Sequence, residues 1–431
     1  MAPDRTDTSE GLVRAISARG LVASIVNATV GAGIFVLPAA VALRLGAAAP
    51  LAFLLCAGAM ALVVACFAIA GSRVARSGGP YAYVERGLGP LAGFLAGVLL
   101  WLSDLLAGSG IAAALASSVA VLVPAVGRGP GRIAFVVGLV GLLALANIRG
   151  VRTGVRVVEA ATAVKLLPLL ALVAVGVLAV RPGHLAWPGM PSAGPLGEAV
   201  LLLVFAFVGV ELALTPSGEV EDPARTVPRA AFIALGLTAL LYGALQLVAQ
   251  GVLGPDLARA PEAPLAEVAA RLLGEPGRAF LVAGASVSMF GYLTGSLLGS
   301  PRTLFALGRD GFLPSAFGRV HPRFRTPWVA IVAHAAAVAV GASSGSFERL
   351  VVMSNVAVLT VYLLCAAAAW RLVREDVREA AAPLRLPGET VIPLLAAGVV
   401  LGILVQATAP ELAVTGAVAG LAAAVYQLRR R

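Results

Sequence analysis

Long apolar runs, separated by short segments rich in glycine, proline and arginine, follow one another along almost the whole chain. A helix of ~20 apolar residues crosses a hydrocarbon core about 30 Å thick, and most of these runs reach that length. We therefore predict an all-α membrane protein with twelve transmembrane helices, at about residues 20–43, 49–72, 91–123, 133–148, 154–180, 196–216, 229–254, 278–305, 327–342, 349–371, 391–407 and 410–428.

The arginines give these helices a direction. Of the 31 arginines, 23 fall in segments on the same side as the N-terminus, and eight fall on the opposite side. In membrane proteins the short cytoplasmic loops carry the excess of positive charge. The pattern predicts a multi-pass protein of the cytoplasmic (inner) membrane with both termini, residues 1–19 and 429–431, in the cytoplasm.

The composition excludes several functional classes. A content of 59% hydrophobic and 13% charged residues excludes a soluble globular protein. The net charge of +10 does not indicate nucleic-acid binding, because the arginines lie in short loops rather than on one basic face. The three cysteines lie in apolar runs without a disulfide or zinc spacing, so we expect no metal and no cofactor.

The polar residues also argue against an enzyme, an ATPase subunit and a channel. No Ser/His/Asp arrangement falls at a shared predicted depth, which disfavours an intramembrane enzyme. A phosphate-binding loop needs a lysine followed by serine or threonine, and the sole lysine, Lys165, precedes Leu166. Polar residues in the spans are too few for the continuous lining of a channel. These observations favour a carrier.

Two spans have the sequence of interrupted helices. The first contains Gly31-Ala32-Gly33 before Pro38, and the sixth contains Phe207-Val208-Gly209 before Pro216. Because the two lie five helices apart, they match the beginnings of two inverted five-helix repeats, at 20–180 and 196–371, followed by two C-terminal helices at 391–428. An unwound helix offers free N–H groups to an anion and free carbonyls to a cation, so a zwitterionic amino acid suits both. Close packing at the glycines is the alternative.

Motifs in a fixed order carry a resemblance to a known family. They are Gly31-Ala32-Gly33-Ile34-Phe35, Ser77-Gly78-Gly79-Pro80-Tyr81-Ala82-Tyr83, Phe205-Ala206-Phe207-Val208-Gly209-Val210-Glu211, Gly218-Glu219-Val220-Glu221-Asp222-Pro223 and Gly308-Arg309-Asp310-Gly311-Phe312-Leu313-Pro314. Together they resemble the amino acid–polyamine–organocation (APC) transporters over nearly the whole chain. The resemblance implies a LeuT-type fold, with the substrate between helices one, three, six, eight and ten.

On matching positions the resemblance implies a substrate site. Amides of Gly31, Ala32 and Gly33 would hold the substrate carboxylate, and carbonyls near Phe207 would accept from its ammonium group. Phe205 would cover the substrate as an aromatic gate. The full predicted set of substrate-binding residues is Thr29, Gly31, Ala32, Gly33, Ile34, Phe205, Phe207, Val208, Gly209 and Asp104. Asn27 departs from the family pattern, since many relatives carry a glycine there.

Lys165 is the most unusual ionisable residue. It lies near the middle of a predicted span, where a charge is costly, and a lysine, unlike an arginine, sheds its proton when desolvated. The resemblance places it where sodium-driven relatives bind a cation between helices one and eight. It would contact carbonyls of helix one and the hydroxyls of Ser286 and Ser288, linking closure to a proton. A permanently charged structural strut is the alternative.

Asp104, Glu211 and His334 are the other buried ionisable candidates. Asp104 is either a partner for Lys165 or Arg152, or a substrate contact that favours a cationic side chain. Glu211 follows the interruption in span six and either caps the broken helix, which we favour, or carries a proton. A lone histidine such as His334 on a peripheral helix is typical of packing.

These observations predict a secondary transporter that moves amino acids by alternating access, with proton coupling as the favoured mode. Exchange or efflux of amino acids or polyamines without net proton flow is the alternative. Few polar side chains line the predicted site, which favours neutral, small or apolar substrates. Its partners are then the substrate, the proton and the lipid bilayer, with no nucleic acid. Relatives occur as monomers and homodimers, and the sequence does not separate these states.

Overall fold

A computed structural model of the chain describes residues 17–74, 79–121, 123–149, 165–187, 189–214, 220, 222–309, 311–324, 326–344, 346–379 and 383–430. Helices make up nearly all of it, and no β-strand occurs in these ranges. The α-helices are α1 (Ala18–Thr29), α2 (Gly33–Leu45), α3 (Ala49–Arg73), α4 (Pro80–Leu88), α5 (Pro90–Ala120), α6 (Gly129–Arg149), α8 (Ala193–Phe207), α9 (Val210–Ala213), α10 (Pro223–Leu253), α11 (Pro264–Gly299), α12 (Pro301–Arg309), α13 (Trp328–Ser344), α14 (Phe347–Arg374), α15 (Ile392–Leu404) and α16 (Ala409–Arg430). A further helix runs from residue 165 to 176.

Short 3-10 turns connect several of these helices. They are η1 (Gly46–Ala48), η2 (Pro124–Val126), η3 (Val177–Ala179), η4 (Pro182–Leu185), η6 (Gly254–Arg259) and η7 (Ser315–Gly318). Parts of the predicted cytoplasmic loops lie outside the described residues, namely 75–78, 215–219 (which includes Pro216), 221, 310 and 325. Arg152 also lies outside them.

Seven stretches of the described chain are long and apolar enough to cross a membrane, as the apolar runs predict. Four shorter apolar helices accompany them, at Lys165–Ala179, Ala193–Phe207, Trp328–Ser344 and Ile392–Leu404. Large apolar side chains are exposed along these helices, among them Leu178 and Leu240 at 88% and 74% exposure. Such surface is favourable only against lipid, so the protein is a multi-pass membrane protein.

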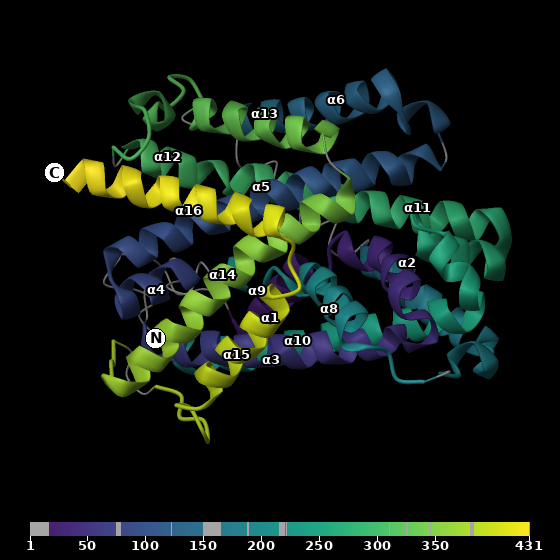
Figure 1. Cartoon of the computed structure of the whole chain (residues 1–431). Helices are drawn as coiled ribbons and strands as arrows, with labels where there is room; N and C mark the ends of the chain where they lie inside the picture. Colours follow the sequence, from purple (N-terminus) through teal and green to yellow (C-terminus); the bar gives the residue numbers. More distant parts are fainter. Residues whose placement is uncertain are drawn as a thin grey trace, which may run out of the picture.

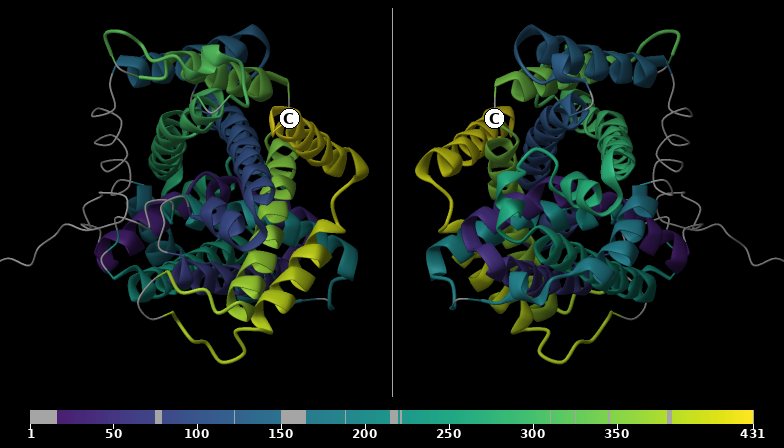
Figure 2. Two further views of the ribbon diagram at one scale, coloured as in Figure 1. Left: turned by 90° about the vertical axis from the view of Figure 1, so that its left-hand side faces the viewer. Right: turned by 90° about the vertical axis from the view of Figure 1, so that its right-hand side faces the viewer.

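The two interruptions lie in the middle of the molecule (Figure 1). In this view α5 and α11 pass above them and α3 and α10 below. α6 and α13 pack against each other on the far side of α5, which the two turned views also show (Figure 2). Among the other close neighbours, α14 lies along α5, α10 lies along α3, and α16 lies against α5 and α14.

One element of the structure joins two helices end to end. In α11 the helical conformation is broken at Gly274, so a short outer helix precedes the helix of the span predicted at 278–305. Gly274 has a φ of +69°, and Pro276 follows it, so the i−4 hydrogen bonds cannot continue through this point.

Candidate functional site

The first interruption separates α1 from α2 at the glycines that the sequence singles out. The last regular hydrogen bond of α1 joins the Val30 N–H to the Val26 carbonyl at 2.8 Å, and the Gly31 N–H turns back to the Thr29 carbonyl at 2.8 Å. This turn leaves the Asn27 carbonyl without the N–H that a continuous helix would supply from residue 31. The first turn of α2, from Gly33, has N–H groups with no intrahelical acceptor.

The second interruption separates α8 from α9. Val208 leaves the helical conformation with ψ 146°, and Gly209 has a φ of +126°, a backbone conformation that only glycine adopts without strain. Glu211 caps this break. Its carboxylate accepts from the Gly209 N–H at 3.1 and 3.2 Å and from the Tyr362 hydroxyl at 2.8 Å. This geometry supports the capping interpretation of Glu211.

The two interruptions touch each other. A Cβ on Gly209 would lie 2.7 Å from the backbone carbonyl of Ala28, at the end of α1. A Cβ on Gly33 would lie 3.0 Å from the Cα of Ala206, and 3.3 Å from the Phe205 ring. The carbonyl end of each broken helix therefore meets the neighbouring break, and both glycines are needed for this approach.

Aromatic residues enclose the junction. Phe207 is fully buried and packs edge-on against Tyr242 of α10, at 5.4 Å between ring centres. The Tyr242 hydroxyl donates to the Thr29 carbonyl at 2.9 Å. Phe205 packs edge-on against Phe347, the first residue of α14. Ile34 is fully buried in the first turn of α2. The predicted residues of helices one and six are thus brought together.

Lys165 reaches the first interruption. Its side chain is 4% exposed, and its ammonium group donates to the Asn27 carbonyl at 2.5 Å. That acceptor is the carbonyl that the break leaves free, so a contact with helix one exists. Gly284, one turn before Ser288 on α11, packs on Pro168, one turn after Lys165. The buried Ser288 hydroxyl has no partner among the described residues, and Ser286 is half-buried.

Asp104 of α5 binds hydroxyls. Its carboxylate accepts from Tyr292 at 2.9 Å, from Ser296 at 2.7 Å and from Ser300. Lys165 is not among its partners in the described chain, and Arg152 lies outside it. The Tyr292 ring approaches the first interruption, because a Cβ on Gly31 would lie 3.9 Å from it. The Tyr292 side chain therefore lies between Asp104 and the unwound segment of helix one.

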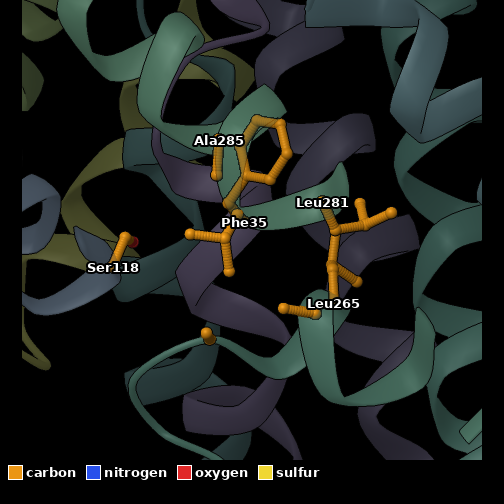
Figure 3. A pocket seen from close by; sticks show the side chains of 8 residues that line it. Phe35, Ser118, Leu265, Leu281 and Ala285 are labelled. Atoms are coloured by element: carbon orange, nitrogen blue, oxygen red, sulfur yellow. The ribbon is translucent and has the colours of Figure 1, made fainter. Parts of the chain in front are cut away.

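Ion pairs hold three helices together at one end of the molecule. Arg44, in the last turn of α2, forms ion pairs with Glu348 of α14 and with Glu198 of α8, the latter at 3.8 Å. Between this end and the break, a cavity of only about 10 Å³ lies among α2, α5 and α11. Figure 3 shows Phe35, Leu265, Leu281 and Ala285 close around it, with Ser118 on its far side. This volume holds about one water molecule.

The two interruptions present backbone groups of both polarities. Helix N-termini favour a carboxylate, and the carbonyl ends of α1 and α8 favour an ammonium group. The described part of the chain contains no cluster of three or more metal-ligating side chains.

The comparison with known proteins identifies the family. Residues 16–425 match the family described as amino acid permease. The chain belongs to this family. An uncharacterized transporter of Mycobacterium tuberculosis is 34% identical, with 99% of this chain and 94% of the relative covered. The methylthioribose transporter of Bacillus subtilis is 30% identical, covering 91% and 88%. The branched-chain amino acid permease of the same organism is 27% identical, covering 91% and 87%.

The permease also contains polar contacts that the sequence analysis did not find. Tyr242 and Tyr362 donate to the backbone and the carboxylate at the two interruptions, and Asn355 of α14 donates to the Leu201 carbonyl of α8 at 2.7 Å. A tyrosine or asparagine inside an apolar run is a usable signal, because a buried polar group needs a partner. The pattern does not tell which helix provides it.

Proposed function

We propose that this permease carries neutral, small or apolar amino acids across the cytoplasmic membrane by alternating access. The observation that carries the proposal is the contact between the two interruptions, where Gly209 lies against Ala28 and Gly33 against Ala206. The substrate carboxylate would bind the first turn of α2, and its ammonium group would bind carbonyls at the ends of α1 and α8. Twelve spans in two inverted repeats, with both termini in the cytoplasm, complete this proposal.

Proton coupling through Lys165 is the favoured mode. Its ammonium group occupies the free Asn27 carbonyl, as a bound cation would. Loss of the proton would remove the positive charge that strengthens this bond and so loosen the end of α1, whereas a permanently charged lysine would hold it throughout the cycle. The apolar side chains around the interruptions favour apolar substrates, and so does the branched-chain permease among the relatives. The methylthioribose transporter among them adds methylthioribose to the compounds that should be tested.

Uptake by purified protein in proteoliposomes tests the proposal. We expect a screen of labelled amino acids and methylthioribose to identify an apolar amino acid, with uptake that increases when the outside is more acidic than the inside. The variant Lys165→Ala should lose this dependence on the pH gradient. Uptake only against preloaded amino acid, unaffected by the gradient in the native protein, would instead identify an exchanger. Absence of uptake and exchange for every amino acid would contradict the proposal.

A further inference from the structure

A second buried polar group lies outside the interruptions, on the peripheral helix α13. His334 is completely buried, and neither of its ring nitrogens has a hydrogen-bond partner in the described part of the chain. Its ring packs against that of Trp101 of α5, at 6.4 Å between centres, and the Trp101 indole N–H is also without a described partner. Buried polar atoms are nearly always hydrogen-bonded, so packing alone does not explain a histidine here.

The contacts between α5 and α13 show where this histidine lies relative to Asp104. A Cβ on Gly108 would lie 3.7 Å from Val338, and a Cβ on Gly341 would lie 2.4 Å from the Ser109 hydroxyl. Together with the Trp101–His334 contact, these pairs show that the two helices run in the same direction.

Asp104 lies on the same face of α5, three residues after Trp101 and four before Gly108. It therefore stands level with the turn of α13 that begins at His334.

We propose that His334 is a proton-binding site, separate from Lys165, whose charge is balanced by the Asp104 carboxylate. A proton taken up on the ring converts the neutral imidazole into an imidazolium with two N–H donors. The proton is the ligand, and no other group changes its covalent bonds. The inference rests on the proposed transport function, because it assigns the proton a second binding place in the carrier.

Asp104 connects this site to the substrate site. Its carboxylate accepts from Tyr292 and Ser296 of α11 and from Ser300, so it joins α5 to α11. An imidazolium beside it competes with these hydroxyls for the carboxylate oxygens. Because the Tyr292 ring borders the first interruption at Gly31, a weaker Tyr292–Asp104 bond changes the wall of the substrate site. Protonation of His334 then alters substrate binding without contact with the substrate.

Few other titratable groups face His334. On α5 the charged group is Asp104, and on the inner part of α11 the titratable group is Tyr292, which donates to it. Towards the ends of the remaining neighbours, α6 and α12, the charged groups are arginines, namely Arg132, Arg149, Arg302 and Arg309. The short turn η7, which also packs on α13, carries no titratable side chain.

Fluorescence of Trp101 tests proton binding directly, because an imidazolium quenches a neighbouring indole. In a full-length variant with Trp187, Trp328 and Trp370 replaced by phenylalanine, we expect a reversible loss of fluorescence as the pH is lowered from about 7 to about 4. The further change His334→Gln should abolish this step, whereas His184→Gln, in a loop, should leave it in place. A step that is absent, or that survives in His334→Gln, would overturn the inference.

Two further measurements keep the test decisive. The native chain has three histidines, so nitrogen-15 labelling of histidine lets the His334 ring be titrated in the unaltered protein, with His334→Gln used for assignment. In proteoliposomes, His334→Gln should flatten the dependence of uptake on pH at zero gradient while uptake at neutral pH persists. An unchanged pH profile would refute the link to transport. A protein that transports nothing would refute the proposed function, and the two titrations would still decide whether His334 binds a proton.

Discussion

At the scale of single residues, the two interruptions depend on side chains that are small or absent. Gly209 combines a φ of +126° with a backbone carbonyl 2.7 Å from the position of a Cβ. Either condition alone disfavours any other residue, and both coincide at the point where α8 ends. The carboxylate of Glu211 then satisfies the N–H group that this geometry exposes.

Replacing Gly209 by alanine is expected to impair transport severely. The strained backbone and the contact with Ala28 together cost about 1–3 kcal/mol, which corresponds to about tenfold or more in uptake rate if the transport cycle must pass through this geometry. Uptake in proteoliposomes measures the effect. Gly295→Ala is the matched control, since a Cβ there meets nothing within 4 Å. Equal uptake by both variants would contradict the role assigned to Gly209.

Substitutions of Glu211 separate a cap from a proton carrier. Glutamine keeps an oxygen that accepts from the Gly209 N–H and from Tyr362, so we expect Glu211→Gln to retain uptake within about threefold. Glu211→Ala leaves both donors unsatisfied and should lose most of it. Uptake of the two variants at several pH values is the measurement. If glutamine is as damaging as alanine, the charge of Glu211 matters and the capping interpretation is wrong.

At the scale of elements, ion pairs tie helix ends together at both ends of the molecule. Arg44 joins α2 to α8 and α14 at one end. At the other end, Arg73 joins the end of α3 to the segment between α14 and α15. Its side chain is only 2% exposed, and it pairs with Asp376 at 3.4 Å and with Glu389 at 3.2 Å. A helix whose end is held in this way moves only together with its partners.

Loss of the Arg44 pairs should open the path above the interruptions. In a background without the three native cysteines, we expect Ser118→Cys, which lines the small cavity, to react slowly with a membrane-impermeant thiol reagent. Adding Arg44→Ala should increase the rate about tenfold or more, because the three helix ends lose their charged contact. Arg259→Ala removes an exposed pair with Asp256 and should have no effect. Equal rates with and without Arg44 would show that these pairs do not close the path.

Removal of Arg73 is expected to destabilise the protein by about 1–3 kcal/mol, because Glu389 and Asp376 lose a buried partner. Thermal unfolding in detergent measures this against Arg225→Ala, whose pair with Asp222 is exposed and should contribute little. A similar small effect in both variants would show that the burial of Arg73 adds no stability.

The same contact has a defined pH dependence. A hydrogen bond from Arg378, and then Arg73, hold the pKa of Asp376 below its ordinary value of 3.8. The pKa of Asp376 is lower in the folded state than in the unfolded state. Its contribution to the free energy of unfolding is therefore complete above the unfolded-state pKa and is lost only as the pH falls through the folded-state pKa. The protection of the backbone N–H groups of residues 376–379 against hydrogen exchange, corrected for the intrinsic exchange rate, should therefore not change between about pH 7 and pH 5 on account of this group. A loss of protection within that range would contradict this assignment.

At the scale of the whole molecule, the all-helical character and the two interruptions were readable from local pattern. Runs of apolar residues locate helices because lipid leaves no other way to satisfy the backbone, and glycines at 31, 33 and 209 mark the points where two of them stop. The span predicted from residue 278 begins a few residues after the break at Gly274, which separates it from the outer part of α11.

Partners across helices were not readable in the same way. The bond from Lys165 to the Asn27 carbonyl depends on which acceptor the break in α1 leaves unused. The three hydroxyls on Asp104 come from residues 188 to 196 positions away, and nothing in a single sequence selects them from the other serines and tyrosines. The packing interpretation of His334 followed from its isolation in the sequence, whereas its contact with Trp101 emerges only in three dimensions.

The burial of Lys165 has a practical consequence. As the sole lysine, it carries the chain's one side-chain amine, and that amine lies against the end of α1. Reductive methylation would therefore report on one internal position, with the N-terminal amine as a built-in reference. The extent of methylation under different substrate and pH conditions would then measure how accessible the Lys165 amine is, without any substitution in the sequence.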